Sequence, residues 1–364
     1  MTLLPRLKAK DSCRWDAVAL GEVMLRLDPG EGRIRTARQF QVWEGGGEYN
    51  VARGLAKTFG LRSAVVTALP RNDLGALVHE LILQGGVSDA LILRREADPV
   101  GRENRVGLNF TERGFGPRGA LGVSDRAHSA ASAMQSDDVD WDALFGEEGV
   151  RWLHTGGIFS ALSESTAETA LAAVTAARRH GTIVSYDLNY RASLWAAHPD
   201  PEAARRVNRA VAEQVDVLIG DEYSLTACLG IETPEVRTDA CDPAPFAAAA
   251  ERLRGQLPNL RLLASPLRDP VTASMNRWGA CAWADGALTV HAPVEVAILD
   301  RVGGGDGFVS GLAFGLMDGR SLEEALALGI AHGALAMTTP GDNAMTSLDE
   351  VEALARGDGA AARR

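Results

Sequence analysis

The sequence contains very little lysine. Only three of its 37 basic residues are lysines, namely Lys8, Lys10 and Lys57, and the others are arginines. A Walker-type phosphate loop needs a lysine directly after its glycines, and the glycine-rich region near the C-terminus has none. The same scarcity argues against lysine Schiff-base chemistry. A phosphate site in this protein would therefore depend on backbone N–H groups, arginine or metal.

Paired cysteines and long apolar segments are also missing. The N-terminal residues lack the apolar core of a signal peptide, and the most apolar late stretch, residues 325–337, is too short to span a bilayer. We therefore expect a cytoplasmic protein without a membrane partner. Neither a zinc site nor a disulfide framework is indicated, because the four cysteines are scattered as Cys13, Cys228, Cys241 and Cys281.

The overall composition is that of an acidic globular protein. Its formal net charge of -11 argues against a nucleic-acid partner, because phosphate backbones attract a surplus of lysine and arginine. A chain of 364 residues with 46% hydrophobic content can bury a full core. We expect one large α/β domain with a small accessory element.

Strand-like and helix-like segments alternate along the chain. This order favours a mostly parallel sheet with helices on both faces. Amphipathic, alanine-rich stretches at residues 165–181 and 201–214 predict helices, and an Ala/Pro-rich tract at residues 241–250 is interpreted as a linker. The predicted strands lie at residues 16–25, 63–69, 150–157, 182–189, 215–220, 260–265 and 294–300.

Two segments, residues 25–45 and 102–128, depart from this order and show a period of two. In the second, Val106, Leu108 and Phe110 alternate with polar or small residues before a Gly/Pro-rich turn. We predict that the two segments form a small β-sheet lid over one edge of the main sheet. A surface hairpin without a role is the alternative.

The lid prediction also divides the chain into regions. The lid comprises residues 25–45 and 102–128. The main domain is predicted at residues 14–24, 46–101 and 129–354. The termini, residues 1–13 and 355–364, are expected to be flexible.

Polar and glycine residues collect where the predicted strands end. Ligands of open α/β sheets bind beyond the carboxyl ends of the strands. The clusters at these ends are Thr155-Gly156-Gly157, residues 187–191, Asp221-Glu222 and the glycine-rich stretch after residue 300. Taken alone, each cluster is also typical of a turn or a helix cap.

The stretch "DRVGGGDGFVSG", residues 300–311, combines glycines with a single carboxylate before a helix-like run. Without side chains, the N–H groups of Gly303, Gly304 and Gly305 can form an anion-binding concavity, and the N-terminus of the following helix adds partial positive charge. Asp306 could then accept the proton of an attacking hydroxyl during phosphoryl transfer. The alternative is a tight turn in which Asp306 is the N-cap.

A second glycine cluster, "WEGGGEYNVARGLAKTFG" at residues 43–60, also begins a helix-like run. Gly46 and Gly47 precede the helix, and Asn50 lies on its first turn. Because a predicted lid strand comes directly before it, we interpret this segment as one wall of a polar small-molecule pocket.

With both motifs in place, the chain resembles the ribokinase-like sugar kinases, and among them the 2-keto-3-deoxygluconate kinases. The resemblance extends from about Ala17 to about Leu354. It is carried by "GGGEYNVARGLA", by "DRVGGGDGF", and by "DLNYRASLW" at residues 187–195. It implies a three-layer α/β/α sandwich with a mostly parallel central sheet and a small β-sheet lid.

The resemblance also implies a role for each motif. Asp306 would be the catalytic base, and the N–H groups of Gly303, Gly304 and Gly305 would form an anion hole. ATP would be the phosphoryl donor, with Mg²⁺ held by phosphates and water and a monovalent cation left open. The implied nucleotide-side residues are Asp221, Arg268, Gly303 and Gly305.

On the sugar side, the resemblance implies that Gly46, Gly47 and Asn50 contact the substrate. Arg126 and Arg191 match positions that hold the acid end of a keto-deoxygluconate, and a pair of guanidinium groups suits a carboxylate. Arg191 alone does not discriminate, because fructokinases also carry it.

Two departures from the family pattern concern metal handling and the pocket. The usual Asn-x-x-Glu element is Asp221 to Ser224 here, so its last carboxylate is missing and Glu222 would have to compensate. Asn109 and Ser124 stand where lid tyrosines are common, which makes the pocket more polar. His332 lies on an apolar helix and is interpreted as a core residue.

These patterns favour an ATP-dependent kinase for the terminal hydroxyl of a sugar acid, specifically 2-keto-3-deoxygluconate at O6. A kinase for a neutral hexose such as fructose is the first alternative, and a sugar-binding regulator without turnover is the second. The apolar face of the lid strands cannot all point at a sugar, so we also expect a homodimer formed through the lid.

Overall fold

The computed structural model describes residues 3–196, 198–232 and 241–358. The outermost residues of both predicted flexible termini, 1–2 and 359–364, therefore lie outside the described residues. Within the N-terminal segment, Leu4 and Cys13 are buried. The mobility of the termini and the division of the chain into a main domain and a lid stay predictions.

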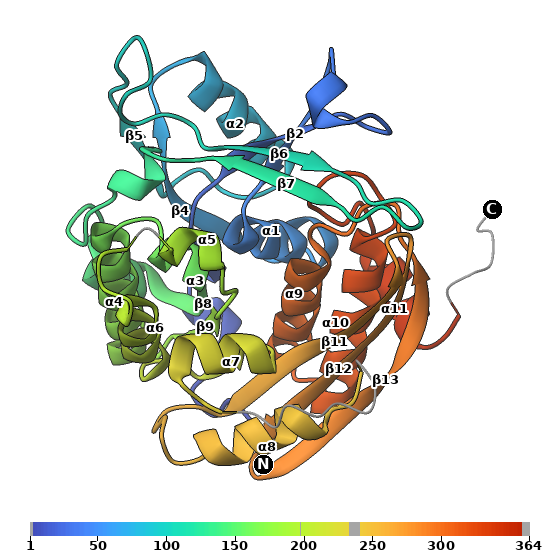
Figure 1. The fold of residues 1–364 in the computed structure, drawn as a ribbon. Helices are drawn as coiled ribbons and strands as arrows, with labels where there is room; N and C mark the ends of the chain where they lie inside the picture. The colour runs from blue at the N-terminus through green and yellow to red at the C-terminus, as the bar shows by residue number, and fades with distance from the viewer. Residues whose placement is uncertain (1–2, 197, 233–240, 359–364) are drawn as a thin grey trace.

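The main element is a nine-stranded sheet with the order β13-β12-β11-β10-β9-β8-β1-β4-β5 (Figure 1). The strands from β11 to β5 run parallel, and β12 is antiparallel to both of its neighbours. Its strands are β1 (Trp15–Leu20), β4 (Ser63–Pro70), β5 (Ile92–Arg95), β8 (Val150–Gly156), β9 (Ile183–Asp187), β10 (Val217–Ile219), β11 (Leu262–Thr272), β12 (Met275–Ala284) and β13 (Ala287–Ala297).

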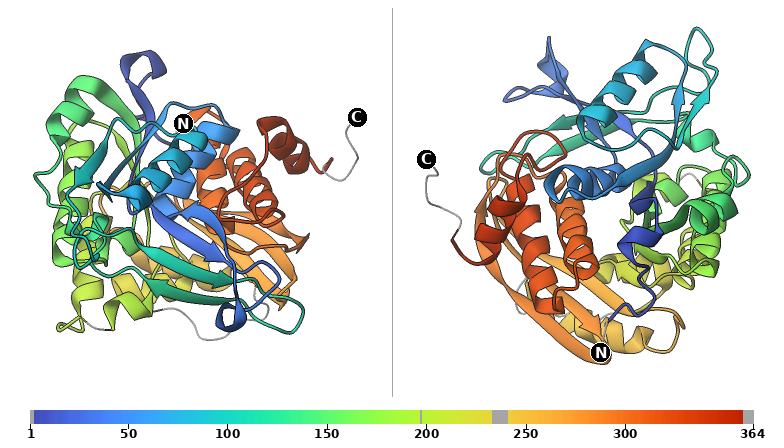
Figure 2. Two further views of the ribbon diagram at one scale, coloured as in Figure 1. Left: turned by 90° about the horizontal axis from the view of Figure 1, so that it is seen from above. Right: turned by 180° about the vertical axis from the view of Figure 1, so that it is seen from behind.

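Helices cover both faces of this sheet (Figures 1 and 2). One group packs on the face reached by Val18 and Leu20 of β1, and the other packs on the face reached by Ala17. This alternation within one strand explains why β1 is buried along its whole length. The first group includes α3 (Gly157–Ser160), α4 (Glu164–Arg179), α6 (Ala203–Ala212), α7 (Glu222–Leu229) and α8 (Ala244–Leu253); the second includes α1 (Gly47–Arg53), α2 (Asp73–Gln84), α9 (Gly304–Met317), α10 (Leu322–Ala336) and α11 (Leu348–Ala355). The short helix α5 (Ala192–Trp195) has no buried residue.

Five short helical segments complete the described chain. A π-helix, η3, continues α1 directly, and the others lie in connections. They are η1 (Lys10–Ser12), η2 (Ile34–Thr36), η3 (Gly54–Thr58), η4 (Ala131–Ala133) and η5 (Ala143–Gly149).

A separate four-stranded sheet, called the small sheet below, has the order β3-β2-β6-β7. Its strands are β2 (Met24–Asp28), β3 (Gln41–Gly45), β6 (Leu108–Glu112) and β7 (Leu121–Asp125). All four overlap the two segments whose sequence has a period of two, and β6 and β7 pair as the expected antiparallel hairpin. The predicted fold class, a mostly parallel α/β sheet plus a small sheet, is confirmed.

Two details of the sequence-based assignment were wrong. The tract at residues 241–250 is not a linker, because most of it belongs to α8, where Pro245 occupies the first turn and Phe246 is fully buried. Proline is tolerated there because its missing N–H would have no partner within the helix. The strands β5 and β12 were not predicted from sequence. Within the described residues, no helix combines the length and apolarity needed to cross a lipid bilayer.

Helices α9 and α10 pack unusually closely because glycines line their contact. A Cβ atom added at Gly311 of α9 would lie 2.5 Å from the carbonyl oxygen of Leu328 and 2.8 Å from Cα of Gly329. At Gly315 it would lie 2.7 Å from Cα of Ala325. This seam fixes the position of α9, whose first turn carries Asp306.

We expect Gly311→Ala to lower the free energy of unfolding by about 1–3 kcal/mol, because the added methyl group overpacks this seam. Chemical denaturation monitored by circular dichroism measures the change. Gly119→Ala is the matched control, since a Cβ at that position meets no atom within 4 Å. Equal stability of the two variants would show that the seam tolerates a methyl group.

Candidate active site

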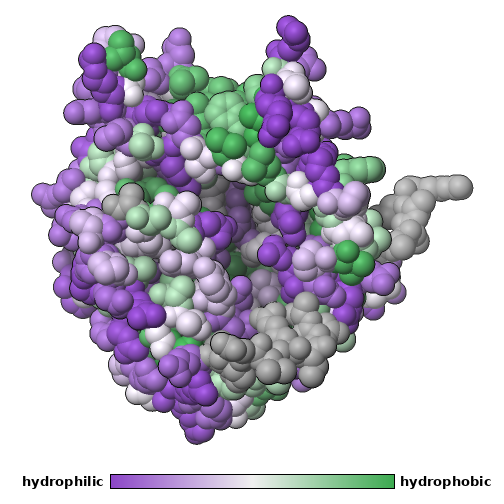
Figure 3. All heavy atoms as spheres, in the orientation of Figure 1, coloured by the Kyte–Doolittle hydropathy of each residue, from purple (hydrophilic) through white to green (hydrophobic). Residues whose placement is uncertain are grey.

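A cleft of about 1250 Å³ opens at the carboxyl ends of the parallel strands and is lined by residues of both sheets. Figure 3 shows the hollow at the centre of this face, beneath an apolar region at the top of the view. The sequence-predicted site residues all line this one cleft: Gly46, Gly47, Asn50, Asn109, Arg126, Arg191, Asp221, Glu222, Arg268, Gly303, Gly304, Gly305 and Asp306. Their individual roles stay predictions.

The helix α9 begins with glycines and has no side-chain cap at its N-terminus. Its N-cap is Gly303, which has a left-handed conformation with φ of 82° and provides no side-chain cap. An ideal Cβ at Gly303 would lie 1.9 Å from the carbonyl oxygen of Asp342, so only glycine fits there. A Cβ at Gly305 would meet open space. The N–H groups of the first turn are thus left uncapped, an arrangement suited to an anion.

Asp306 is the third residue of α9 rather than its N-cap, so the interpretation of Asp306 as a cap was wrong. Burial of the carboxylate raises the pKa of Asp306 to about 6, although a hydrogen bond from Asn50 and the charge of Arg191 both lower it. Nδ2 of Asn50 donates to Oδ2 of Asp306 at 2.7 Å. This hydrogen bond therefore joins the glycine-rich start of α1 to the glycine-rich start of α9.

The turn before α1 brings the main chain close to Asp306. Gly46 has φ of 154°, and a Cβ there would lie 2.0 Å from the carbonyl oxygen of Glu22. A Cβ at Gly47 would lie 3.5 Å from Oδ1 of Asp306 and 3.6 Å from Nδ2 of Asn189. These glycines leave the space beside the carboxylate open for a small ligand.

Two further buried carboxyl groups lie near Asp306. Burial raises the pKa of Asp187 to about 7, and repulsion from Asp306 contributes. Burial likewise raises the pKa of Glu48 to about 7. Because like charges in one site disfavour joint ionisation, these groups limit how much negative charge the cleft carries near neutral pH. From sequence, Asp187 was recognised as part of a strand end and of the motif at residues 187–195, without a role of its own.

The two arginines predicted to hold a carboxylate differ in their surroundings. Arg126 forms an ion pair with Glu22, and both side chains are largely buried. Arg191 is exposed, and its Nη1 donates to the carbonyl oxygen of Tyr190 at 3.3 Å. Among the described residues, no carboxylate forms a salt bridge with Arg191. Glu22 was missed by sequence analysis, although its place just after β1, at a strand's carboxyl end, was an available signal.

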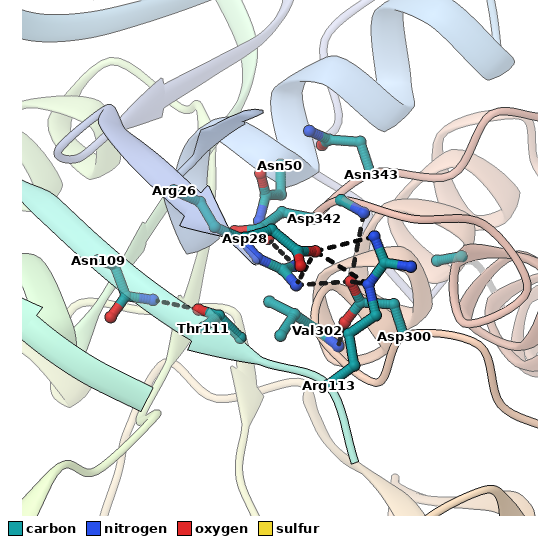
Figure 4. Close-up of polar contacts among 12 residues, drawn as sticks. Arg26, Asp28, Asn50, Asn109, Thr111, Arg113, Asp300, Val302, Asp342 and Asn343 are labelled. Carbon is teal, nitrogen blue, oxygen red and sulfur yellow. Dashed lines mark hydrogen bonds and ion pairs between the residues drawn. The ribbon is translucent and has the colours of Figure 1, made fainter. Parts of the chain in front are cut away.

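The small sheet contributes a row of polar groups. Oγ of Ser124 donates to Oδ1 of Asn109 at 3.3 Å, and Nδ2 of Asn109 donates to Oγ1 of Thr111 at 3.0 Å. Asn109 and Ser124 both line the cleft, and Figure 4 shows the Asn109–Thr111 contact along β6. The residues that replace lid tyrosines thus present amide and hydroxyl groups to the pocket.

On the opposite side of the cleft, Asp221 caps α7. Its Oδ1 accepts hydrogen bonds from the N–H group of Ser224 at 2.8 Å and from the Ser224 hydroxyl. Nearby, burial and repulsion from Arg301 lower the pKa of Arg268. Within the part of the chain that the structure describes, no group of three or more His, Cys, Asp or Glu side chains could hold a metal ion by itself.

His332 is buried, as predicted. Its Nδ1 lies 2.8 Å from Oγ of Ser310, and its Nε2 lies 3.2 Å from Oγ1 of Thr58. Burial lowers the pKa of His332 to about 4. The neutral imidazole thus ties α10 to α9 and η3 behind the cleft.

Comparison with known proteins supplies the family. Residues 16–349 match the model described as pfkB family carbohydrate kinase. The chain is 32% identical over 345 residues to the 2-dehydro-3-deoxygalactonokinase of Haloferax volcanii, covering 94% of this chain and 97% of the relative. It is 25% identical over 341 residues to the 5-dehydro-2-deoxygluconokinase of Clostridium tetani, covering 93% and 91%.

Solved structures agree with these relatives. The crystal structure of 2-dehydro-3-deoxygluconokinase from Thermotoga maritima is 34% identical, with a TM-score of 0.85 over 94% of this chain and 99% of that chain. A putative Ribokinase II from E. coli, solved in complex with ATP and Mg²⁺, is 18% identical with a TM-score of 0.75 over 94% and 99%. The latter shows likeness of fold alone.

The motif resemblance, the α/β fold and the whole-length family match agree with one another. The resemblance to keto-deoxy sugar acid kinases is confirmed by the relatives from Haloferax volcanii and Thermotoga maritima. The chain belongs to the pfkB family of carbohydrate kinases, and it is a phosphotransferase with an alcohol group as acceptor.

Proposed function

We propose that this protein transfers the γ-phosphoryl group of ATP to the terminal hydroxyl of a sugar acid, specifically to O6 of 2-keto-3-deoxygluconate. The carrying observation is the carboxylate of Asp306 beside the uncapped N-terminus of α9, in the same cleft as Arg191. Two of the similar proteins bear names that refer to 2-dehydro-3-deoxy sugar acids, which supports this substrate class.

In the proposed reaction, Asp306 accepts the proton of the acceptor hydroxyl as that oxygen bonds to the γ-phosphorus. The bond from the γ-phosphorus to the bridging oxygen breaks, and ADP leaves. The transition state is loose, so little proton transfer is required early and an ordinary carboxylate suffices. The N–H groups of Gly303, Gly304 and Gly305 stabilise charge on the transferring group, an effect worth about 3–4 kcal/mol per well-placed donor in other enzymes.

The nucleotide side of the cleft supports ATP with Mg²⁺. Mg²⁺ prefers phosphate oxygens and water, and it would neutralise charge on the triphosphate. Oδ1 of Asp221 already accepts two hydrogen bonds from Ser224. We therefore assign the triphosphate to the anion hole and Arg268, and Asp221 would lie beside it. Glu222 would lie near the hydrated metal. The putative Ribokinase II from E. coli, which has a similar fold, was solved in complex with ATP and Mg²⁺. This supports ATP as the phosphoryl donor here.

One observation favours a second candidate, a kinase for a neutral ketose such as fructose. Glu22 already neutralises Arg126, so only Arg191 remains without a salt bridge to a described residue at the predicted acid end. A sugar acid would then be held by one guanidinium group, or it would displace Glu22 from Arg126.

The proposal has two further parts. We propose a homodimer through the small sheet, because Val42, Leu121 and Val123 expose 40%, 42% and 45% of their surface there. Such exposed apolar groups are typical of a protein interface. We place the reaction in the cytoplasm, where ATP is supplied.

Asp306→Asn should lower kcat by roughly 10²- to 10⁴-fold, because the amide cannot accept the hydroxyl proton. Sugar binding measured by calorimetry should stay near wild type, while coupled assays follow ADP release. Asp318→Asn, at the other end of α9, is the matched control and should keep full activity. Comparable turnover in Asp306→Asn and Asp318→Asn would exclude Asp306 as the base.

Arg191→Ala should lower kcat/KM for 2-keto-3-deoxygluconate by roughly 10- to 100-fold, since a charge-assisted contact with the carboxylate is lost. The same change should affect fructose much less. Arg205→Ala removes an arginine whose ion pair in the described part of the chain is with exposed Glu202, and it serves as the control. If Arg191→Ala and Arg126→Ala weaken the acid no more than the ketose, the carboxylate assignment is wrong.

The rate should depend on pH through Asp306. The base acts only when ionised, and its raised pKa places the loss of kcat/KM for the sugar at about pH 6 as the pH falls. Asn50→Ala removes a hydrogen bond that favours the carboxylate, so the midpoint should move to higher pH. Ser124→Ala, which changes the cleft without contacting Asp306, should leave the midpoint in place. An unshifted midpoint in Asn50→Ala would contradict the assignment.

A further inference from the structure

A buried network of charges lies at the edge of the cleft, and of its members only Asp300 belongs to a motif that the sequence analysis quoted. Arg26 of β2 is fully buried. Its Nη1 donates to Oδ1 of Asp342 at 2.6 Å, and its Nη2 donates to Oδ2 of Asp300 at 2.6 Å and to Oδ2 of Asp28 at 3.2 Å. Arg113 adds a hydrogen bond from Nε to Oδ2 of Asp28 at 2.9 Å. Figure 4 shows both arginines converging on the three aspartates.

The partners of Arg26 belong to the segments that shape the anion hole. Asp300 begins the loop that leads to Gly303, and its Oδ1 accepts a hydrogen bond from the N–H group of Val302 at 3.2 Å. Its Oδ2 also accepts from the N–H group of Gly341 at 3.3 Å. One carboxylate thus holds the anion-hole loop and the loop that follows α10.

Asp342 extends the same connection. Its main-chain oxygen lies where a Cβ of Gly303 would be, at 1.9 Å from the ideal position. Its side chain packs against Gly45, the residue before Gly46, where a Cβ would lie 2.2 Å from Oδ2. Through Asp342, Arg26 therefore reaches both the N-cap of α9 and the turn that precedes α1.

Arg26 is needed to keep the net charge of this network close to zero. Two arginines and three aspartates give a net charge of -1 (+2 and -3). Without Arg26 the cluster would carry -2, buried beside the cleft. Buried carboxylates without a partner are strongly unfavourable, so the loops would rearrange to reach water or protons. Burial already raises the pKa of Asp342 to about 6, and repulsion from Asp300 and Asp306 contributes.

We propose that Arg26 is a positioning residue for phosphoryl transfer, which locks the anion-hole loop to the small sheet through Asp300 and Asp342. Arg26 touches neither nucleotide nor sugar in this scheme. It holds Gly303 and the start of α9 in the geometry that meets the transferring group. The inference deepens the proposed kinase function and, for its catalytic consequence, rests on it.

The chain offers a matched buried arginine at the opposite end of the sheet. Arg151 of β8 is largely buried, and its Nη1 lies 3.3 Å from Oδ1 of fully buried Asp16 of β1. Both residues stand near the start of their strands, whereas the cleft lies at the carboxyl ends. Losing Arg151 should therefore destabilise the protein without reaching the anion hole.

The test compares Arg26→Met, Arg26→Lys and Arg151→Met in the full-length protein. Both methionine variants should melt at lower temperature. In Arg26→Met alone, kcat should fall by about 100-fold, as expected for a displaced catalytic group, while KM for sugar and ATP changes little. Arg26→Lys should recover part of the loss, because it restores one charge but not the two-armed contact.

Amide hydrogen exchange of the unliganded protein gives a readout that requires no substrate. Arg26→Met should lose protection at Val302 and Gly341, whose N–H groups donate to Asp300, and at Gly307, whose N–H group donates to the carbonyl oxygen of Gly303. Arg151→Met should keep that protection. Unchanged protection there, or a kcat no lower than that of Arg151→Met, would overturn the proposal. If Arg26→Met does not fold, Arg26→Lys must show a smaller fall in kcat and a smaller loss of amide protection. The absence of both effects in Arg26→Lys would contradict the proposal.

The experiment separates this inference from the proposed function. Failure of the wild-type protein to phosphorylate any sugar or sugar acid would refute the kinase proposal. The exchange pattern would still decide whether Arg26 holds the anion-hole loop.

Discussion

The site depends on a helix that begins without a side-chain cap. Most helices satisfy their first N–H groups with a serine, threonine or aspartate at the N-cap, but α9 begins with Gly303 and offers its amides to the cleft. This arrangement exposes polar groups that the protein does not itself satisfy, so it suits an anionic ligand. The carboxylate of Asp306 stands on the same first turn, which places the base and the amides in a fixed relation.

The rest of the fold holds that first turn in place. The glycine seam with α10 allows α9 to lie close to its neighbour, and the hydrogen bond from Asn50 connects Asp306 to α1. The charge network around Arg26 joins the preceding loop to the small sheet. Three kinds of interaction, close packing, a hydrogen bond to a carboxylate and buried ion pairs, therefore converge on one turn of helix.

Much of this site could be predicted from sequence because its motifs are local. The glycine runs at residues 45–47 and 303–305 announce turns, helix starts and open backbone, and the polar strand ends indicate one edge of the sheet. Arg26 and Asp342 could not be found in this way, because they lie 316 residues apart and only the fold brings them together. From sequence alone, an arginine inside a strand, such as Arg26, is interpreted as a solvated side chain. Only the fold shows that aspartates surround it. The helix α8 was misread because a proline among alanines was taken as a linker signal, whereas Pro245 lies in the first turn and Phe246 packs into the core.

The most direct test of the account is ³¹P NMR of the protein incubated with ATP, Mg²⁺ and 2-keto-3-deoxygluconate. The account predicts ADP and an equal amount of a new phosphomonoester whose signal is split into a triplet by the two protons of the terminal carbon. A doublet from a secondary hydroxyl, or ADP with only inorganic phosphate, would contradict transfer to the terminal hydroxyl beside Asp306.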